Sequence, residues 1–427
     1  MARRKAAILE DGARPAATRA RQVRAQDRCR AISEAASEVI ASHGIAGLTH
    51  RLVAGQAGVP LAATTYHFES KADIIRAATQ AVLEGYDRSF ARARERFRKQ
   101  GGSRGAFFDF FIDLMQNTAG RARLRATCWG EIMLDMPRHP ANLDMTRNWF
   151  GRLVAVWEDI IATCGVDRPA ERAIVATDAL IGLLLLVVGL GLDDRQIGKI
   201  IAGHDLLDFR PAVPGKDSAG PARTGAKAAA TRDKILSATI DILKAEGPGA
   251  VNRRTVAESA NLSKAAAFYY FDSVPDLLVN AQRTLFQRSK ERYRRGLSEF
   301  GGSDADFEHL IDRTATVFLR EVTEYSSDCV ANYSIWLRAD QEPLIRAMVW
   351  EVTADQHISW RNVLGRWKQE LNPFDPLLAQ ALFLGKLTRI LATGSRIEDL
   401  AAARREFAFA LNDIIAGNWA FDKNSTD

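Results

Sequence analysis

The sequence has few of the features that mark secreted, metal-binding or membrane-spanning chains. Its four cysteines are far apart in 427 residues, without a CxxC or Cys/His pair, which argues against disulfides and metal and favours reduced thiols in a cytoplasmic protein. The longest uncharged run, residues 179–192, is too short to span a membrane and predicts a buried helix. The basic N-terminus lacks the apolar core of a secretory signal.

Motifs of catalysis are also missing. We find no ExxH metal pair, no glycine-rich phosphate loop and no GxSxG elbow. The sequence therefore predicts a protein that is not an enzyme and that has no cofactor.

Positive charge is present but unevenly distributed. The net charge is +6, yet residues 1–100 alone carry +8 and residues 222–300 carry +6, while the remaining segments sum to −8. Two basic blocks alternating with acidic ones are typical of two surfaces that bind a polyanion.

The chain repeats itself at an offset of 203 residues. This offset aligns Ile32–Ala78 with Ile235–Ala281 without a gap and with 14 identities in 47 positions. A repeat of this length predicts two copies of one domain in tandem. Between them, residues 208–230 are rich in proline, glycine and basic residues and predict a flexible linker. Elsewhere apolar residues recur at three- and four-residue spacing, which predicts an all-α fold.

Each copy carries the signals of a helix-turn-helix. Thr49 and Asn252 stand where a helix N-cap is expected, because their side chains can accept a backbone N–H. Gly58 and Asn261 follow the helix and are the residue types that tolerate a left-handed C′ position. A short second helix follows each tight turn, and we expect it to face outward.

The short helix of the first copy resembles the recognition helix of TetR-family transcription regulators. The resemblance rests on AGVPLAATTYHF, residues 57–68, and on the following Ser70-Lys71. The second copy, ANLSKAAAFYYF, is less similar, with Asn261 in place of glycine and Phe268 at the tyrosine position. The resemblance implies two tandem TetR-like units, each a three-helix head and a helical ligand-binding and dimerisation bundle. The implied domains are a basic N-terminal arm (1–25), a first head (26–72), a first regulatory domain (73–207), the linker (208–230), a second head (231–275) and a second regulatory domain (276–420).

The resemblance also implies which residues contact double-stranded DNA. Small side chains of the second helix are expected at base edges and the polar or basic ones at phosphates. In the first copy these residues are Thr49, His50, Arg51, Ala62, Ala63, Thr64, Thr65, Tyr66, His67 and Lys71. In the second copy they are Asn252, Arg253, Arg254, Ser263, Lys264, Ala267, Phe268, Tyr269 and Tyr270. Arg19, Arg21, Arg24 and Arg28 are candidates for an arm along the DNA. The alternative for Tyr66 and His67 is a structural role in the core of the head.

Behind each head, the resemblance implies a mostly apolar pocket for a small hydrophobic effector. The candidate lining residues are Phe111, Met115, Trp129, Trp149, Phe318, Tyr333, Trp336 and Trp360. The alternative is plain core packing. Two helix pairs, within 168–206 and 374–418, resemble the dimerisation helices of the family and predict an intrachain pseudo-dimer, with a homodimer of the whole chain as the alternative.

Together these features predict a ligand-responsive transcriptional regulator. We expect a repressor that binds a pseudo-palindromic operator through two non-identical heads and is released by the effector. The alternative is a helical small-molecule sensor in which one or both heads no longer bind DNA.

Overall fold

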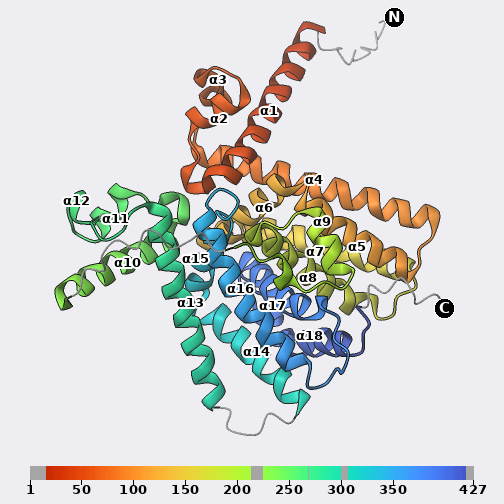
Figure 1. The fold of residues 1–427 in the computed structure, drawn as a ribbon. Helices are drawn as coiled ribbons and strands as arrows, with labels where there is room; N and C mark the ends of the chain where they lie inside the picture. Colours follow the sequence, from red (N-terminus) through yellow and green to blue (C-terminus); the bar gives the residue numbers. More distant parts are fainter. Residues whose placement is uncertain (1–15, 213–224, 268, 300–305, 420–427) are drawn as a thin grey trace, which may run out of the picture.

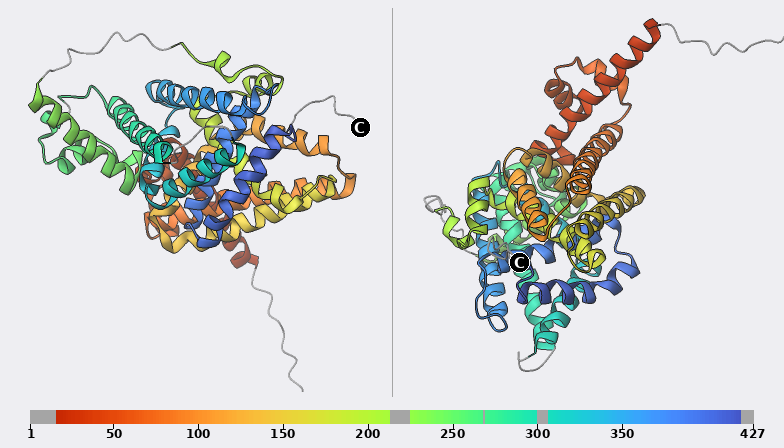
Figure 2. Two further views of the ribbon diagram at one scale, coloured as in Figure 1. Left: turned by 90° about the horizontal axis from the view of Figure 1, so that it is seen from below. Right: turned by 90° about the vertical axis from the view of Figure 1, so that its right-hand side faces the viewer.

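The computed structural model describes residues 16–212, 225–267, 269–299 and 306–419. Within these ranges the chain is helical and contains no β-strand, so the predicted all-α fold is confirmed. Both heads stand at the edge of the molecule, and the remaining helices form one body from which the heads project (Figures 1 and 2).

The first half of the chain contains nine α-helices within the described residues. They are α1 (Ala16–Gly47), α2 (His50–Ala57), α3 (Leu61–His67), α4 (Lys71–Gln100), α5 (Arg104–Ala119), α6 (Arg123–Asp135), α7 (Leu143–Thr163), α8 (Pro169–Leu190) and α9 (Asp194–Ile201). Short 3-10 turns η1 (Met136–Arg138) and η2 (Pro140–Asn142) join α6 to α7, and η3 (Leu206–Phe209) follows α9.

The second half repeats this order. Its helices are α10 (Ala226–Glu246), α11 (Arg253–Ser259), α12 (Lys264–Ala267), α13 (Val274–Glu299), α14 (Phe307–Thr323), α15 (Ser326–Trp336), α16 (Pro343–Leu364), α17 (Phe374–Thr393) and α18 (Ile397–Ile415), with the 3-10 turn η4 (Pro248–Ala250) after α10.

Two predicted segments have more regular structure than expected. The basic arm (1–25) is helical over its described part, because α1 begins at Ala16 and runs on into the head. Residues 1–15 lie outside the described residues. The predicted linker (208–230) is also helical at both ends, where η3 extends to Phe209 and α10 begins at Ala226. The connection between the halves is therefore shorter than the composition suggested.

Contacts between the halves recur at the offset of 203 residues. Arg147 of α7 donates from Nε to the carbonyl of Thr393, 2.6 Å away, at the end of α17. At the equivalent positions, Trp350 of α16 donates from Nε1 to the carbonyl of Leu190, 2.9 Å away, at the end of α8. Different side chains thus make the same contact from the first half to the second and from the second half to the first.

Helices α8 and α17 make the most extensive contact among the described helices. They cross where Gly182 meets the backbone of Ala381, and Gly385 meets that of Asp178. A Cβ atom on either glycine would lie within 2 Å of a carbonyl oxygen, at 1.8 and 1.7 Å, so only glycine permits this approach. Helix α8 is long and apolar enough to cross a membrane, but 89% of its apolar window is buried within the protein. The prediction of a buried helix at 179–192 is confirmed.

The predicted pairing of two helices from each half needs a correction. Helix α9 packs on α5 of its own half. Helix α18 packs chiefly on α14 but also lies against α8 of the other half, where Arg172 and Asp413 form a buried ion pair. Helices α7 and α16 lie against α17 and α8 as well. Because α9 has only eight residues, it is too short to extend along α17.

Candidate functional site

The first helix-turn-helix is built by the local signals that its sequence carries. Thr49 caps α2, its Oγ1 accepting the backbone N–H of Leu52 at 3.2 Å. Gly58 ends α2 with φ 63° and ψ 31°, the left-handed conformation expected there. Pro60 precedes α3 with φ −58°. The turn therefore sets α3 across α2 at the surface of the head (Figure 1).

Helix α3 presents one face to solvent. Tyr66 is 84% exposed, Leu61 is 50% exposed, and Ala62 and Thr65 are also exposed. These positions fall on one side of a helix with 3.6 residues per turn. A duplex groove could therefore be approached by this face without unfolding the head.

Thr64 was expected at the DNA, and that prediction is wrong. Its side chain is fully buried, and its Oγ1 donates to the carbonyl of Leu61 at 2.8 Å and lies 3.3 Å from Nδ1 of His50. Thr64 precedes the core residue Phe68 by four positions, which places both on the inner face of α3. Leu61, which was not predicted, is exposed because it is the first residue of α3, where the helix leaves the turn.

Two further predicted contacts are engaged within the head. His67 Nδ1 lies 3.4 Å from the Cys29 thiol on α1. Lys71 donates from Nζ to the carbonyl of Ala46 at 2.7 Å. Partial burial lowers the pKa of Lys71, although Asp135 and Glu246 act in the opposite direction. Arg51, by contrast, is exposed at the start of α2. Arg24 and Arg28 are exposed on α1, and the side chains of Arg19 and Arg21 lie outside the described residues.

The second helix-turn-helix uses other residues for the same geometry. Asn252 Oδ1 accepts the backbone N–H groups of Arg254 and Thr255, at 3.0 and 3.1 Å, and Thr255 returns a hydrogen bond to complete a capping box. Asn261 takes φ 49° after α11. The predicted caps and left-handed positions are thus confirmed in both heads.

The exposed residues of the second head surround a shorter helix. Helix α12 spans four residues, against seven in α3. Arg253, Arg254 and Lys264 are exposed, as is Tyr269 at 59%, and Tyr270 is partly buried against the core. Ser263 and Asn252 are exposed at the turn and the cap. Phe268 and the side chain of Ala267 lie outside the described residues. DNA contact by any of these residues stays a prediction.

A cavity of about 460 Å³ lies in the body of the second half. Tyr333, Trp336 and Trp360, three of the four candidates there, line it, together with residues of α13, α14, α16 and α17. Two buried polar atoms at its wall have no hydrogen-bond partner: Nε1 of Trp336 and Oε1 of Gln380. The fourth candidate, Phe318, is fully buried against Phe383 and Phe407 and belongs to the core.

The pocket candidates of the first half are core residues. Phe111, Met115, Trp129 and Trp149 were pocket candidates, but each is at most 2% exposed and packs in the core. This half has a cavity of about 80 Å³ and a more open groove of about 770 Å³ between α4, α5 and α9, and none of these four residues lines either of them. The prediction of a pocket lined by them is therefore wrong, and plain packing explains all four.

Buried charges connect the second cavity to its own head. Glu321 at the cavity wall forms two hydrogen bonds with Arg292 of α13, at 3.2 and 3.1 Å. Arg292 also bonds Asp328 of α15 at 3.1 Å, and Asp328 pairs with Lys244 of α10 at 2.6 Å. Glu321 additionally accepts the thiol of Cys329 at 2.9 Å, and burial together with this carboxylate raises the pKa of Cys329.

The geometry defines a helix-turn-helix protein with a ligand-sized cavity behind it. Residues 32–78, the core of the first head, match the family model described as bacterial regulatory proteins, tetR family. The HTH-type transcriptional regulator CymR of Pseudomonas putida is 24% identical over 120 residues, which are 28% of this chain and 56% of CymR. The chain thus spans little more than half the length of this curated relative.

Solved structures that match part of this chain include the following two proteins. The transcriptional regulator SCO7518 from Streptomyces coelicolor A3(2) is 19% identical, covers 44% of this chain and 98% of its own, and has a TM-score of 0.33. A protein described as a TetR-family transcriptional regulator from Rhodococcus sp. is 22% identical, covers 44% of this chain and 99% of its own, and has a TM-score of 0.35.

The family match covers the first head. Its helix-turn-helix is similar to the one that the tetR family model describes.

Proposed function

We propose that this protein is a ligand-responsive repressor in which two unlike heads of one chain bind the two half-sites of one operator. The observation that carries the proposal is the pairing of α8 with α17, because it sets both heads on one body. The heads support it by their position at the edge of the molecule and by the exposed faces around Tyr66 and Tyr269. The predicted DNA contacts are kept, except Thr64.

Buried charge at the α8–α17 crossing favours pairing between unlike halves. Asp178 of α8 is fully buried and pairs with Lys386 of α17 at 2.7 Å and with Arg389 at 2.6 Å. Burial acts to raise the pKa of Asp178, but the two cations outweigh it and hold the pKa below its usual value. Glu406 of α18 neutralises the second cation.

The charges do not recur at the offset of 203 residues. The positions equivalent to Lys386 and Arg389 in α8 are Leu183 and Leu186, and the position equivalent to Asp178 in α17 is Ala381. Two α8 helices facing each other would leave Asp178 against leucines, and two α17 helices would bury two cations per half with Glu406 as their one remaining partner described above. An unpaired buried charge costs several kcal/mol, roughly 3–5. The pairing is therefore expected within one chain rather than between identical halves of two chains.

The heads are expected to read different sequences. Ala62 and Thr65 stand on the exposed face of α3, whereas Lys264 opens α12. The operator should then be an imperfect palindrome whose half-site centres lie about 34–36 Å apart, one helical turn of DNA.

The cavity in the second half is the proposed effector site. Its aromatic and aliphatic walls suit a small hydrophobic molecule. Trp336 Nε1 would donate a hydrogen bond to such a molecule, and Gln380 Oε1 would accept one from it. We expect the bound effector to favour a spacing of the heads that does not fit the operator. A cytoplasmic location follows from this role.

Selection of bound fragments from random DNA, followed by footprinting of the recovered site, tests the proposal. We expect two unlike protected half-sites, one chain per site by analytical ultracentrifugation, and affinity that falls steeply with salt because phosphate contacts release counterions. Replacing Arg253 and Arg254 with glutamate should remove protection from one half-site. No selected sequence would refute the proposal and favour a sensor without DNA binding. Two chains per site would refute the intrachain arrangement.

A further inference from the structure

Each half of the chain donates polar side chains to the first helix of the opposite head. Arg138 in η1 donates to the carbonyls of Leu243 and Lys244 at the end of α10, at 2.8 and 2.9 Å. Gln341, after α15, donates to the carbonyl of Ala41 near the end of α1, at 3.2 Å. The last carbonyls of a helix have no partner within it, so such donors hold the helix end in place.

These contacts are equivalent in the two halves. Arg138 and Gln341 are 203 residues apart, and so are their acceptors Lys244 and Ala41. The contact from each half to the opposite head therefore follows from the way the two halves pack together, and it is not peculiar to one of the two turns.

The segment that holds the first head is the bridging turn, residues 338–341. Its Arg338 donates from Nη1 to the carbonyl of Ser42 at 3.0 Å and from Nη2 to Glu131 of α6. Gly44 of α1 faces this pair, and a Cβ atom there would lie 2.8 Å from Arg338 Nη2. The end of α1 is thus fitted closely to the bridging turn.

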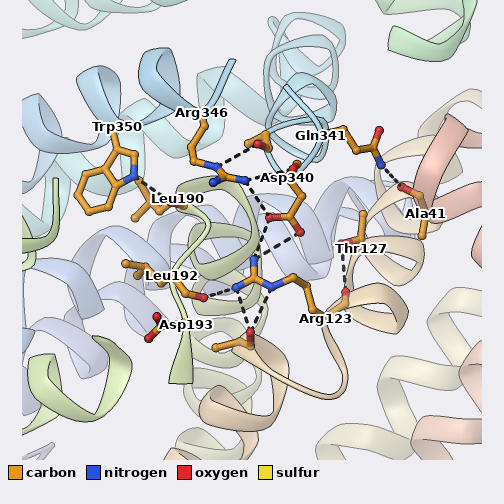
Figure 3. A network of polar contacts seen from close by, with 12 residues as sticks. Ala41, Arg123, Thr127, Leu190, Leu192, Asp193, Asp340, Gln341, Arg346 and Trp350 are labelled. Atoms are coloured by element: carbon orange, nitrogen blue, oxygen red, sulfur yellow. Dashed lines mark hydrogen bonds and ion pairs between the residues drawn. The ribbon is translucent and has the colours of Figure 1, made fainter. Parts of the chain in front are cut away.

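The bridging turn is also fixed to the first body. Asp340 accepts Arg123 of α6 at 3.1 Å, and Arg123 in turn donates to the carbonyls of Leu192 and Ala119 (Figure 3). Figure 3 also shows Gln341 reaching Ala41 beside this network. Any displacement of the turn is therefore passed to α1 and α6 together.

The bridging turn begins two residues after a wall of the cavity. Trp336, the last residue of α15, lines the cavity and is 1% exposed. Movement of α15 on filling of the cavity would displace the turn that holds the first head. The same cavity reaches the second head through Glu321, Arg292 and Asp328 to Lys244.

We propose that the second-half cavity controls both heads: its own head through the charge chain that ends at Lys244, and the opposite head through the bridging turn. This proposal rests on the proposed function, since it explains how one effector site could release both half-sites. It also accounts for the packed core at the first-half pocket candidates, because the first head receives its signal from the other half.

The equivalent residues of the first half supply a mimic of occupancy. Thr314 lines the cavity, and the position equivalent to it in the first half is Phe111. Thr314→Phe therefore fills the space with a side chain that the fold accommodates at that position. Leu310→Phe, which copies Phe107, serves if the first variant does not fold.

Amide hydrogen exchange of the full chain without DNA tests the coupling. We expect Thr314→Phe to speed exchange by about ten-fold in residues 36–47 and in residues 239–247. Adding Gln341→Ala should change the response of the α1 end only, and adding Lys244→Met, which keeps the backbone carbonyl, that of the α10 end only. Phe111→Leu in the first body is the matched control and should change the exchange rate at neither helix end.

A response at one helix end only, or one that neither added variant alters, would overturn the proposal. Footprinting of the same variants separates it from the proposed function. Exchange responses at both ends without operator binding would refute the DNA-binding role but keep the coupling. Operator binding with a response at one head alone would refute the coupling but keep the role.

Discussion

Trp157 in the first half and Trp360 in the second occupy equivalent positions, 203 residues apart, in different surroundings. Trp157 is fully buried and packs against Phe107, Phe110 and Phe111 of α5. At the positions equivalent to these three phenylalanines, α14 carries leucine, arginine and threonine, and these residues line the cavity with Trp360. Three differences on one helix thus separate a closely packed tryptophan from one that borders a cavity.

If the second-half cavity is the effector site, as proposed, the two halves divide their tasks. A closely packed core is rigid and holds a head in one place, whereas a cavity with unpaired polar atoms at its wall can exchange water for a ligand. The shared outline survives because α8 and α17 still meet at Gly182 and Gly385.

The largest effect is expected from removing the closely packed tryptophan of the first half. Trp157→Ala should lower the free energy of unfolding by about 4 kcal/mol, because it leaves a large cavity among ring contacts that cannot collapse. Trp360→Ala, the matched variant, should cost less than about 1.5 kcal/mol, since its ring is partly exposed and already borders empty space. Urea unfolding of both variants measures the difference. Equal losses would contradict the comparison.

The second-largest effect is expected from removing the buried charge of Asp178, which pairs α8 with α17. Asp178→Asn leaves Lys386 and Arg389 short of a buried partner and should cost about 3 kcal/mol at neutral pH. The pKa of Asp178 is lowered in the folded state, so this stabilisation is present above its usual value of 3.8 and lost as the pH falls through the folded value. Urea unfolding at pH 7 measures it. Asp87→Asn, which breaks the exposed pair with Arg152, is the control and should cost under about 1 kcal/mol.

The two heads can be compared through their exposed tyrosines. Tyr66→Phe and Tyr269→Phe remove only a hydroxyl from equivalent surface positions, and each should weaken operator binding about five-fold if both hydroxyls reach phosphate. Titration of labelled operator at fixed salt measures the two losses. A loss for Tyr66→Phe alone would show that the shorter α12 does not bring its head to the DNA. Thr64→Val, on the inner face of α3, should leave affinity within about two-fold.

The features that the sequence predicted are local ones. An N-cap such as Thr49 or Asn252 and a left-handed residue such as Gly58 act within three or four positions, so one segment contains the whole signal. The inward turn of Thr64 was also within reach, because Phe68 lies four residues later on the same face. Tyr333, Trp336 and Trp360 at the cavity wall were also named from the sequence. The packed core at the first-half candidates was not predicted, since the sequence does not show which aromatic side chains of α5 and α7 meet until the helices pack.

The smallest effects distinguish two glycines of the first head. Gly55 lies within α2 and Gly58 at its left-handed end, and a Cβ atom on either would meet nothing within 4 Å. Sterics are therefore equal, and only backbone conformation differs. Gly55→Ala should raise stability by up to about 1 kcal/mol, because alanine favours the helix and restricts the unfolded chain. Gly58→Ala should lower it by about 1 kcal/mol, because alanine disfavours the left-handed region.

Asn261 extends the same comparison to the second head. Asn261 has a φ of 49° although it lacks the conformational freedom of glycine. Asn261→Ala should therefore lower the free energy of unfolding less than Gly58→Ala does, and the difference should be about a few tenths of a kcal/mol. The midpoint temperatures of thermal unfolding show whether each of the three variants is more or less stable than the unaltered protein. If Gly55→Ala and Gly58→Ala shifted the midpoint in the same direction, the turn between α2 and α3 would not require a left-handed residue. The orientation of α3 would then depend on packing alone, and the two heads could share it without sharing this turn.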